Sequence, residues 1–188
     1  MLSDDKSNLF GVNVFFDNDF EAEHQRGSIG LEVKGAYLDL TVNSYYALTD
    51  SKNYKGTAEE VLSGQTINLA SQIPYAPWAN LNLQSYSWEN VKASSDTEGY
   101  TVSIESYLTP SLALEVKNDY SDNDAVDDEL TYKLTYNYPP RGDGKSMQDG
   151  LSKLAFEKQN MEAKLKDKVK RDNNIVIEIQ GSVIITSK

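Results

Sequence analysis

The chain has 188 residues, no cysteine, 12 tyrosines and a formal net charge of −11. Without cysteine, it has neither disulfide bonds nor thiolate metal sites. The charge is uneven, because residues 1–140 hold 8 Lys and Arg against 22 Asp and Glu, whereas residues 141–188 hold 10 against 7. An acidic body argues against nucleic-acid binding, which basic patches drive. The acids interspersed in the basic tail favour a solvated helix face over a nucleic-acid or lipid patch.

The length fits one domain, or one domain with an appendage. There is no run of about 18 apolar residues, so we expect no transmembrane helix. The start of the chain, Met1 to Lys6, has no apolar stretch and no small-residue cleavage site, so we expect no signal peptide in this chain.

Apolar and polar residues alternate along most of the body, which is the period-2 pattern of a strand with one apolar face. Pro139 and Pro140 cannot donate to a sheet ladder, so the last strand should stop before them. In chain order, the expected strands are about Leu9–Phe20, Ser28–Gly35, Tyr37–Leu48, Gln65–Ile73, Trp78–Trp88, Tyr100–Leu108, Leu112–Tyr120 and Leu130–Tyr138.

The connections between these strands alternate in length. The first, third, fifth and seventh are long and polar, such as 49–64 and 121–129, whereas the others are tight, such as 74–77. An up-and-down sheet would then carry all its long loops at one end, as bacterial outer-membrane barrels do. The apolar register of each strand also carries no charge, and a charge facing lipid near the midplane costs roughly 2–4 kcal/mol. We therefore predict an all-β fold, an antiparallel up-and-down outer-membrane β-barrel segment of about eight strands.

The tail has a different period. Apolar residues three or four apart, Leu151, Leu154, Met161, Leu165 and Val169, predict an amphipathic helix over about 147–171, interrupted by Lys158. Asp172 to Asn174 should end it, and Ile175–Ile179 and Gly181–Thr186 look like short β segments. We thus expect a transmembrane β-barrel region over 1–140 and a linker over 141–188.

Two alternatives remain open at this point. A soluble antiparallel sheet also alternates, and Ser44, Ser71, Ser85 and Ser106 lie on the apolar face and weaken the lipid interpretation. The chain could be a soluble β-sandwich binding module. It could also be a stand-alone eight-stranded outer-membrane barrel with the tail outside.

Several stretches, in this order, resemble the β-domain of the inverse autotransporters, the intimin and invasin family. They are Gly11 to Phe20, His24-Gln25-Arg26 leading into Gly30-Leu31-Glu32, Pro74-Tyr75-Ala76-Pro77, Tyr107-Leu108-Thr109-Pro110, the final tyrosine-rich strand, and Lys170 to Glu178. The resemblance implies an outer-membrane barrel whose C-terminal linker passes back through the pore to surface-exposed adhesive domains. It also implies that Met147–Arg171 is the linker helix and Ile175–Ile179 the segment that leaves the pore.

The sequence departs from the family pattern at both ends. The family barrel has twelve strands, so the first four are missing from the eight counted here, and no passenger domain follows Lys188. We therefore expect a β-domain truncated at its N-terminal side, serving outer-membrane anchoring and passenger translocation for an adhesin. The implied partners are outer-membrane lipid, the barrel assembly machinery and its own linker in the pore. A host receptor would be reached only through the absent passenger domains.

No enzyme signature is present, and we assign no catalytic, cofactor-binding or metal residues and no cofactor. His24, the only histidine, lies in a polar loop, where a solvated or turn-stabilising role is favoured. Asp17 and Asp19 share the expected lumen face, but nothing marks a substrate cleft. Tyr46, Tyr100, Tyr136 and Tyr138 fit either an interfacial aromatic belt or ordinary surface positions.

Two further motifs resemble binding sites, but a non-functional interpretation is favoured for each. The carboxylates of Asp122, Asp124, Asp127, Asp128 and Glu129 could gather a divalent cation, but they lack the glycine spacing of a calcium loop, so a solvated acidic loop is favoured. Arg141-Gly142-Asp143 is a tripeptide that many integrin ligands display. Its position after the last strand favours a chance occurrence in a flexible linker.

Overall fold

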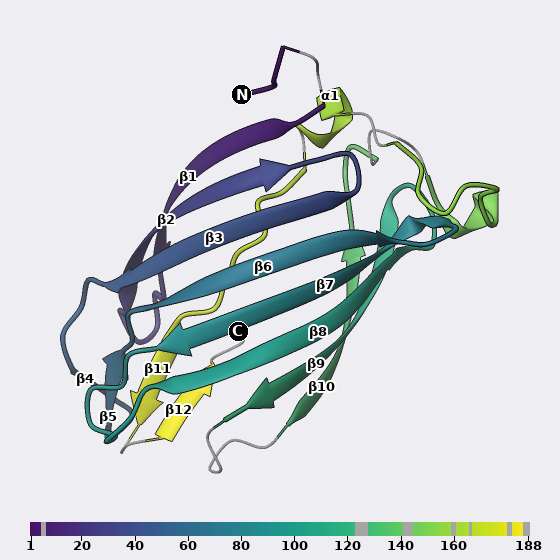
Figure 1. Ribbon diagram of the computed structural model, residues 1–188. Coiled ribbons are helices and arrows are strands. Elements are labelled where there is room, and N and C mark those ends of the chain that lie inside the picture. Colours follow the sequence, from purple (N-terminus) through teal and green to yellow (C-terminus); the bar gives the residue numbers. More distant parts are fainter. Residues whose placement is uncertain are drawn as a thin grey trace.

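The fold is built on one large antiparallel sheet, seen in a computed structural model that describes residues 1–4, 7–122, 128–140, 145–158, 161–165, 167–179 and 182–185 (Figure 1). Eight strands lie in the order β1-β2-β3-β6-β7-β8-β9-β10. Their bounds are β1 Leu9–Asn18, β2 Gln25–Lys34, β3 Leu38–Ala47, β6 Gly64–Ile73, β7 Ala76–Trp88, β8 Thr97–Tyr107, β9 Leu112–Ser121 and β10 Glu129–Tyr136. All eight predicted strands are confirmed, in an up-and-down order.

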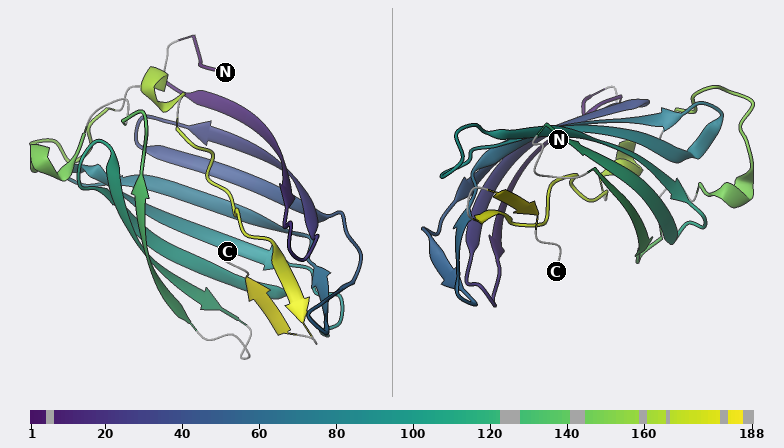
Figure 2. Two further views of the ribbon diagram at one scale, coloured as in Figure 1. Left: turned by 180° about the vertical axis from the view of Figure 1, so that it is seen from behind. Right: turned by 90° about the horizontal axis from the view of Figure 1, so that it is seen from below.

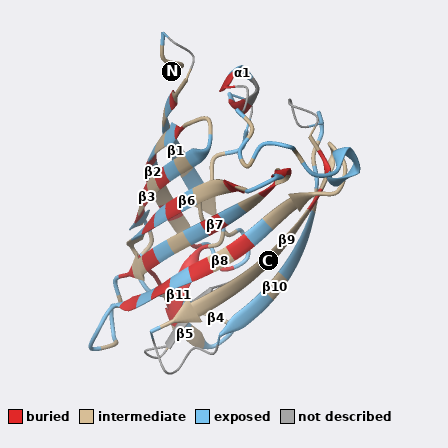
Figure 3. Cartoon of the chain, turned by 45° about the vertical axis from the view of Figure 1, so that its right-hand side comes forward, coloured by how far each residue is buried: buried red, intermediate tan, exposed pale blue. Residues whose placement is uncertain are grey.

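The alternation of the sequence becomes two faces of this sheet. Val12 pairs with Leu31, Leu31 with Val42 and Val42 with Ile67, so these apolar residues line one face, which we call the outer face. Their polar neighbours line the opposite, inner face, because successive side chains point to opposite sides of a strand. Figure 3 shows the resulting alternation of burial along the strands.

The two ends of the sheet differ as predicted. The turns after β2, β6 and β8 are short, whereas those after β1, β3, β7 and β9 are longer and lie at the opposite end (Figure 1). We call these the short-turn end and the long-loop end. The long connection after β3 was predicted as a loop, which is wrong in part: it holds a hairpin, β4 Lys52–Tyr54 and β5 Thr57–Val61. Lys55 and Gly56 turn it with positive φ values of 50° and 88°, a geometry suited to tight hairpins.

A second, smaller sheet lies at the long-loop end. It has the order β12-β11-β5-β4, where β11 is Val176–Ile179 and β12 is Ser182–Ile185. Both short β segments predicted in the tail are therefore confirmed. Buried side chains from both sheets meet here; one cluster comprises Tyr45, Leu62, Tyr86, Trp88 and Val176. The apolar core thus sits where the end of the chain meets the large sheet.

The eight strands do not close into a barrel. Among the described residues, β1 and β10 are the two edges of the large sheet. A closed barrel of eight strands has room inside only for its own side chains. Here the C-terminal segment crosses the concave inner face (Figure 2), so the inner face cannot close on itself. The alternative of a stand-alone eight-stranded barrel with the tail outside is therefore wrong.

The long helix predicted over 147–171 is also wrong. The described part of this range contains only a 3₁₀ turn at Met147–Asp149 and a short helix, α1, at Met161–Lys164. Leu151 and Leu154, which should have formed the apolar stripe, are both exposed. A helix in a protein depends on packing its apolar side, and the backbone here bonds to the β6–β7 turn instead. None of the described helices is long and apolar enough to cross a membrane.

The outer face of the large sheet is largely uncovered. Val12 is 71% exposed, Val14 73% and Leu31 59%. A soluble β-sandwich needs a second sheet packed on such a face, and within the described residues the only other sheet lies at the long-loop end. The β-sandwich alternative does not fit this architecture. A face this apolar and this large indicates contact with another apolar phase.

Candidate functional site

The inner face holds the C-terminal segment 161–179. It is part of the predicted linker over 141–188, and from here on we use the name linker for 161–179 alone. It runs from α1 at the short-turn end to β11 at the long-loop end (Figure 1). Most of it is extended, and the side chains of the surrounding strands bind it at three levels. These contacts join the linker to residues that are distant in the sequence.

The first level lies at the short-turn end. The ammonium of Lys164 donates to both carboxylate oxygens of Asp39, at 2.6 and 2.9 Å, and to the carbonyl of Gly35 at 3.0 Å. Lys164 is 8% exposed. Its charge is therefore compensated within the protein, as a buried cation requires.

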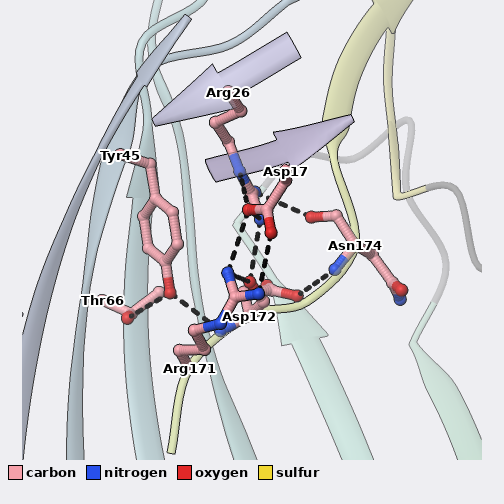
Figure 4. Close-up of polar contacts among 7 residues, drawn as sticks. All are labelled: Asp17, Arg26, Tyr45, Thr66, Arg171, Asp172 and Asn174. Atoms are coloured by element: carbon pink, nitrogen blue, oxygen red, sulfur yellow. Dashed lines mark hydrogen bonds and ion pairs between the residues drawn. The ribbon is translucent and has the colours of Figure 1, made fainter. Parts of the chain in front are cut away.

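The second level is an ion cluster on the inner face toward the long-loop end, where Asp17 lies opposite Arg26 near the end of the β1–β2 pair (Figure 4). Asp17 on β1 accepts from Arg26 on β2, at 3.0 and 3.2 Å, and from Arg171 of the linker, at 2.7 and 2.9 Å. One carboxylate thus joins two guanidinium groups. Arg26 is fully buried and the side chain of Arg171 is 12% exposed. Such fork-shaped, charge-assisted bonds specify geometry as well as attraction.

The same level also binds the backbone of the linker. Arg26 donates to the carbonyls of Asp172, at 2.8 Å, and Asn174, at 2.7 Å. The hydroxyl of Tyr45 accepts from the Asp172 N–H at 2.8 Å, and Asn43 donates to the carbonyl of Lys170 at 3.1 Å. An extended segment has no partners of its own for these peptide groups. The inner face supplies them and so fixes the register of the linker.

Aromatic rings and a further acid complete the second level. The Arg26 guanidinium lies 4.5 Å from the ring centre of Tyr45, and that of Arg171 lies 4.1 Å from the ring centre of Phe15. Lys170 pairs with Glu105 at 3.3 Å. The positive charges of the linker therefore meet acids and aromatic faces, both of which attract cations.

The third level lies at the long-loop end. Strand β11 adds to β5, with Ile177 opposite Val61. Glu178 is fully buried, and its carboxylate accepts from the backbone N–H groups of Val91, Lys92 and Ala93, the shortest distances being 2.7, 3.0 and 2.8 Å. Successive N–H groups of this kind form an anion-binding nest. The loop after β7 is thereby fastened to the end of the linker.

This arrangement binds one extended peptide along a polar surface. The family model for the inverse autotransporter β-domain matches residues 2–173. The chain belongs to the inverse autotransporter β-domain family. The match includes the large sheet, the first level of linker contacts and all of the second level except Asn174.

Several much longer bacterial proteins are similar to this chain. Intimin of Escherichia coli O157:H7 is 27% identical over 191 residues, which cover 96% of this chain and 20% of intimin. Invasin of Yersinia enterocolitica is 25% identical over 182 residues, covering 92% of this chain and 21% of invasin. The inverse autotransporter adhesin YeeJ of E. coli K12 is 23% identical over 191 residues, which cover 94% of this chain and 8% of YeeJ. This chain thus spans about a fifth or less of the length of these relatives.

A solved structure shares the fold of this β-domain. It comes from work on the in-meso crystallization of membrane proteins, and it superposes with a TM-score of 0.76 at 21% sequence identity. The superposition covers 93% of this chain and 75% of that one.

The inverse autotransporter motifs supply several of the linker contacts. In the His24-Gln25-Arg26 motif, Arg26 faces the linker. His24, expected to be solvated or turn-stabilising, is 2% exposed, and its Nε2 lies 2.7 Å from a carboxylate oxygen of Glu59 on β5. It therefore connects the first long loop to the small sheet. A solvated role is wrong, and a structural one fits.

The remaining acidic candidates do not form a metal site in the described part of the chain. Asp17 is in the ion cluster, whereas Asp19 accepts from the N–H of Glu21, at 2.9 Å, and that of Ala22 in the loop after β1. Asp128 and Glu129 are exposed. Asp124 and Asp127, like Arg141-Gly142-Asp143, lie outside the described residues.

The four tyrosines proposed for a belt lie on the outside and at both ends of the sheet. Tyr46 and Tyr100 are near the long-loop end, with exposed fractions of 53% and 51%. Tyr136 and Tyr138 are near the short-turn end, with exposed fractions of 70% and 87%. Their placement fits an aromatic belt at each interface of a membrane.

Sequence reasoning did not single out Arg26, Arg171 or Glu178 as functional. The sequence contained one relevant signal. The tail carries an excess of positive charge, and the polar register of the strands carries acidic residues. It could indicate that tail and inner face attract each other. It could not pair Arg171 with Asp17, which lies 154 residues earlier.

Proposed function

We propose that this chain is the membrane-anchoring part of an outer-membrane adhesin. The large sheet forms part of a barrel wall, with lipid against its outer face. The linker is the segment that connects the wall to adhesive domains on the cell surface. The short-turn end faces the periplasm and the long-loop end the exterior, as is usual for such barrels. Its role is anchoring and translocation rather than catalysis.

The observation that carries this proposal is the linker on the inner face. A sheet that is apolar outside and polar inside suits a bilayer. On its inner face, Arg26 binds the backbone of the linker and Asp17 binds the side chain of Arg171. The linker crosses the whole sheet and ends in β11 among the long loops. A passenger attached beyond it would emerge on the exterior side.

Further strands of the same protein would complete the wall between β1 and β10. The edge at β1 already binds the start of the chain, because Leu2 bridges Leu9 in antiparallel fashion. The solved relative, a quarter of which has no counterpart here, supports a larger wall. The barrel assembly machinery is the expected partner for inserting such a wall, and host receptors would bind the passenger.

Refolding into detergent micelles and, in parallel, into plain buffer tests the anchoring role. We expect a β-rich, heat-modifiable species only in micelles, measured by circular dichroism and by gel shift with and without boiling. Trypsin should spare Arg171 in that species but cut at Lys55, which is exposed in the β4–β5 turn. A cooperative β-rich monomer in plain buffer would contradict the proposal.

A further inference from the structure

Residues 145–158 form a closed loop before the linker, at the short-turn end of the sheet (Figure 1). Lys145 and Glu157 join its two ends through an ion pair of 2.8 Å. That hydrogen bond from Lys145 lowers the pKa of the Glu157 carboxyl. Asp149 accepts from the Ser146 N–H at 2.7 Å and so caps the 3₁₀ turn. The loop is thus held together by its own polar groups.

The loop is also fastened to the β6–β7 turn. The Tyr75 N–H donates to the carbonyl of Ala155, and the Ser152 N–H donates to the carbonyl of Tyr75, both at 2.8 Å. The indole N–H of Trp78 donates to the carbonyl of Gly150, also at 2.8 Å. These three bonds fix the side of the loop that faces the protein.

The loop also exposes large apolar side chains. Leu151 is 73% exposed and Leu154 63%, with Met147 at 47% and Phe156 at 41%. Surface loops are usually polar, and a cluster of exposed large apolar side chains on a fixed backbone marks an interaction surface.

This apolar surface continues into the outer face of the sheet. The rings of Phe156 and Tyr37 are in edge contact, with centroids 6.0 Å apart. Tyr37 precedes Leu38, the first outer-face residue of β3, which is 51% exposed. The loop also exposes Lys153 and Lys158, whose charge complements anionic lipid headgroups.

We propose that the 145–158 loop is a membrane-interface anchor that inserts Leu151 and Leu154 among phospholipids at the short-turn end. This inference rests on the proposed contact between the outer face and lipid. The anchor fixes the point from which the chain turns back toward the inner face. It would hold the start of the linker while the passenger is loaded or pulled.

Single cysteines test the proposal directly, because the chain has none of its own. Leu151→Cys carries an environment-sensitive fluorophore in vesicles of phosphatidylethanolamine and phosphatidylglycerol. Leu83→Cys, on the outer face of β7, reports insertion of the sheet, and Asp50→Cys, exposed at the long-loop end, is the aqueous control. Gel shift on heating verifies that each variant is folded.

We expect spin-labelled lipids to quench Leu151→Cys and Leu83→Cys but not Asp50→Cys. Labels near the headgroup should act more strongly at Leu151, and labels near the chain terminus more strongly at Leu83. Quenching at Leu83 but not at Leu151 would overturn the anchor and leave the membrane proposal intact. No quenching at Leu83 would refute the membrane proposal and the anchor with it. Disulfide-linked dimers of the unlabelled Leu151→Cys protein under mild oxidation, together with no quenching of its labelled form, would assign the surface to a second copy of the chain.

Discussion

Replacing Asp17 by Asn should release the linker from the inner face. The substitution keeps the shape of the side chain but leaves the guanidinium groups of Arg26 and Arg171 without their shared carboxylate. Both cations are largely withdrawn from solvent, with side chains 0% and 12% exposed. Removing one partner of a buried ion pair costs about 3–5 kcal/mol. Arg26 keeps two carbonyl acceptors, so we expect the lower value, about 3 kcal/mol.

Hydrogen–deuterium exchange of the peptide 170–179 measures this effect in the micelle-bound protein. A loss of about 3 kcal/mol in local stability should speed exchange on the order of 100-fold. The matched control is Asp19→Asn, because Asp19 caps the loop after β1 by accepting from the N–H groups of Glu21 and Ala22. Adding Arg171→Leu to Asp17→Asn removes one unpaired cation and should restore much of the protection.

Unchanged exchange over 170–179 in Asp17→Asn would refute this reasoning. It would mean that the backbone bonds and β11 hold the linker without the ion cluster. A loss of protection that Asp19→Asn reproduces would also refute it, since the effect would then come from the loop after β1.

Four other substitutions, of which Gln84→Arg is the control for Leu83→Arg, probe separate parts of the structure. Glu178→Gln removes the charge in the nest and should weaken β11 by about 1–3 kcal/mol, measured as faster exchange of its amides. Leu83→Arg should cost roughly 2–4 kcal/mol of bilayer stability, measured by urea titration in vesicles. Gln84→Arg, on the inner face, should cost less. Gly30→Val should displace Asn43, because the added Cβ would collide with its amide, and so expose the linker to trypsin.

Each of these has an outcome that would contradict it. If Leu83→Arg and Gln84→Arg lower the stability in vesicles by the same amount, the two faces of the sheet meet the same environment. Protection of β11 in Glu178→Gln equal to that of the parent would assign its stability to strand pairing alone. Continued resistance to trypsin in Gly30→Val would show that the inner face has room to adjust.

The sequence by itself determined the strands, their order and their two faces. A strand points alternate side chains to opposite sides, so the local sequence already shows that Val12 and Asn13 lie on different faces. The short turns and long loops were equally local features. The order of the family motifs, from Gly11 to Glu178, further identified the family, which the match over residues 2–173 confirms.

The tail shows where local pattern fails. Leu151 and Leu154 have helical spacing, yet they lie in a loop. The backbone groups of this loop form hydrogen bonds with the backbone of Tyr75 and the indole of Trp78 instead of with one another in a helix. Only the tertiary structure decided this, because a helix and a docked loop compete for the same peptide groups. It also decided that the sheet stays open around the linker. Asp17 and Arg171 meet across 154 residues through the curvature of the whole sheet, which no local pattern of residues encodes.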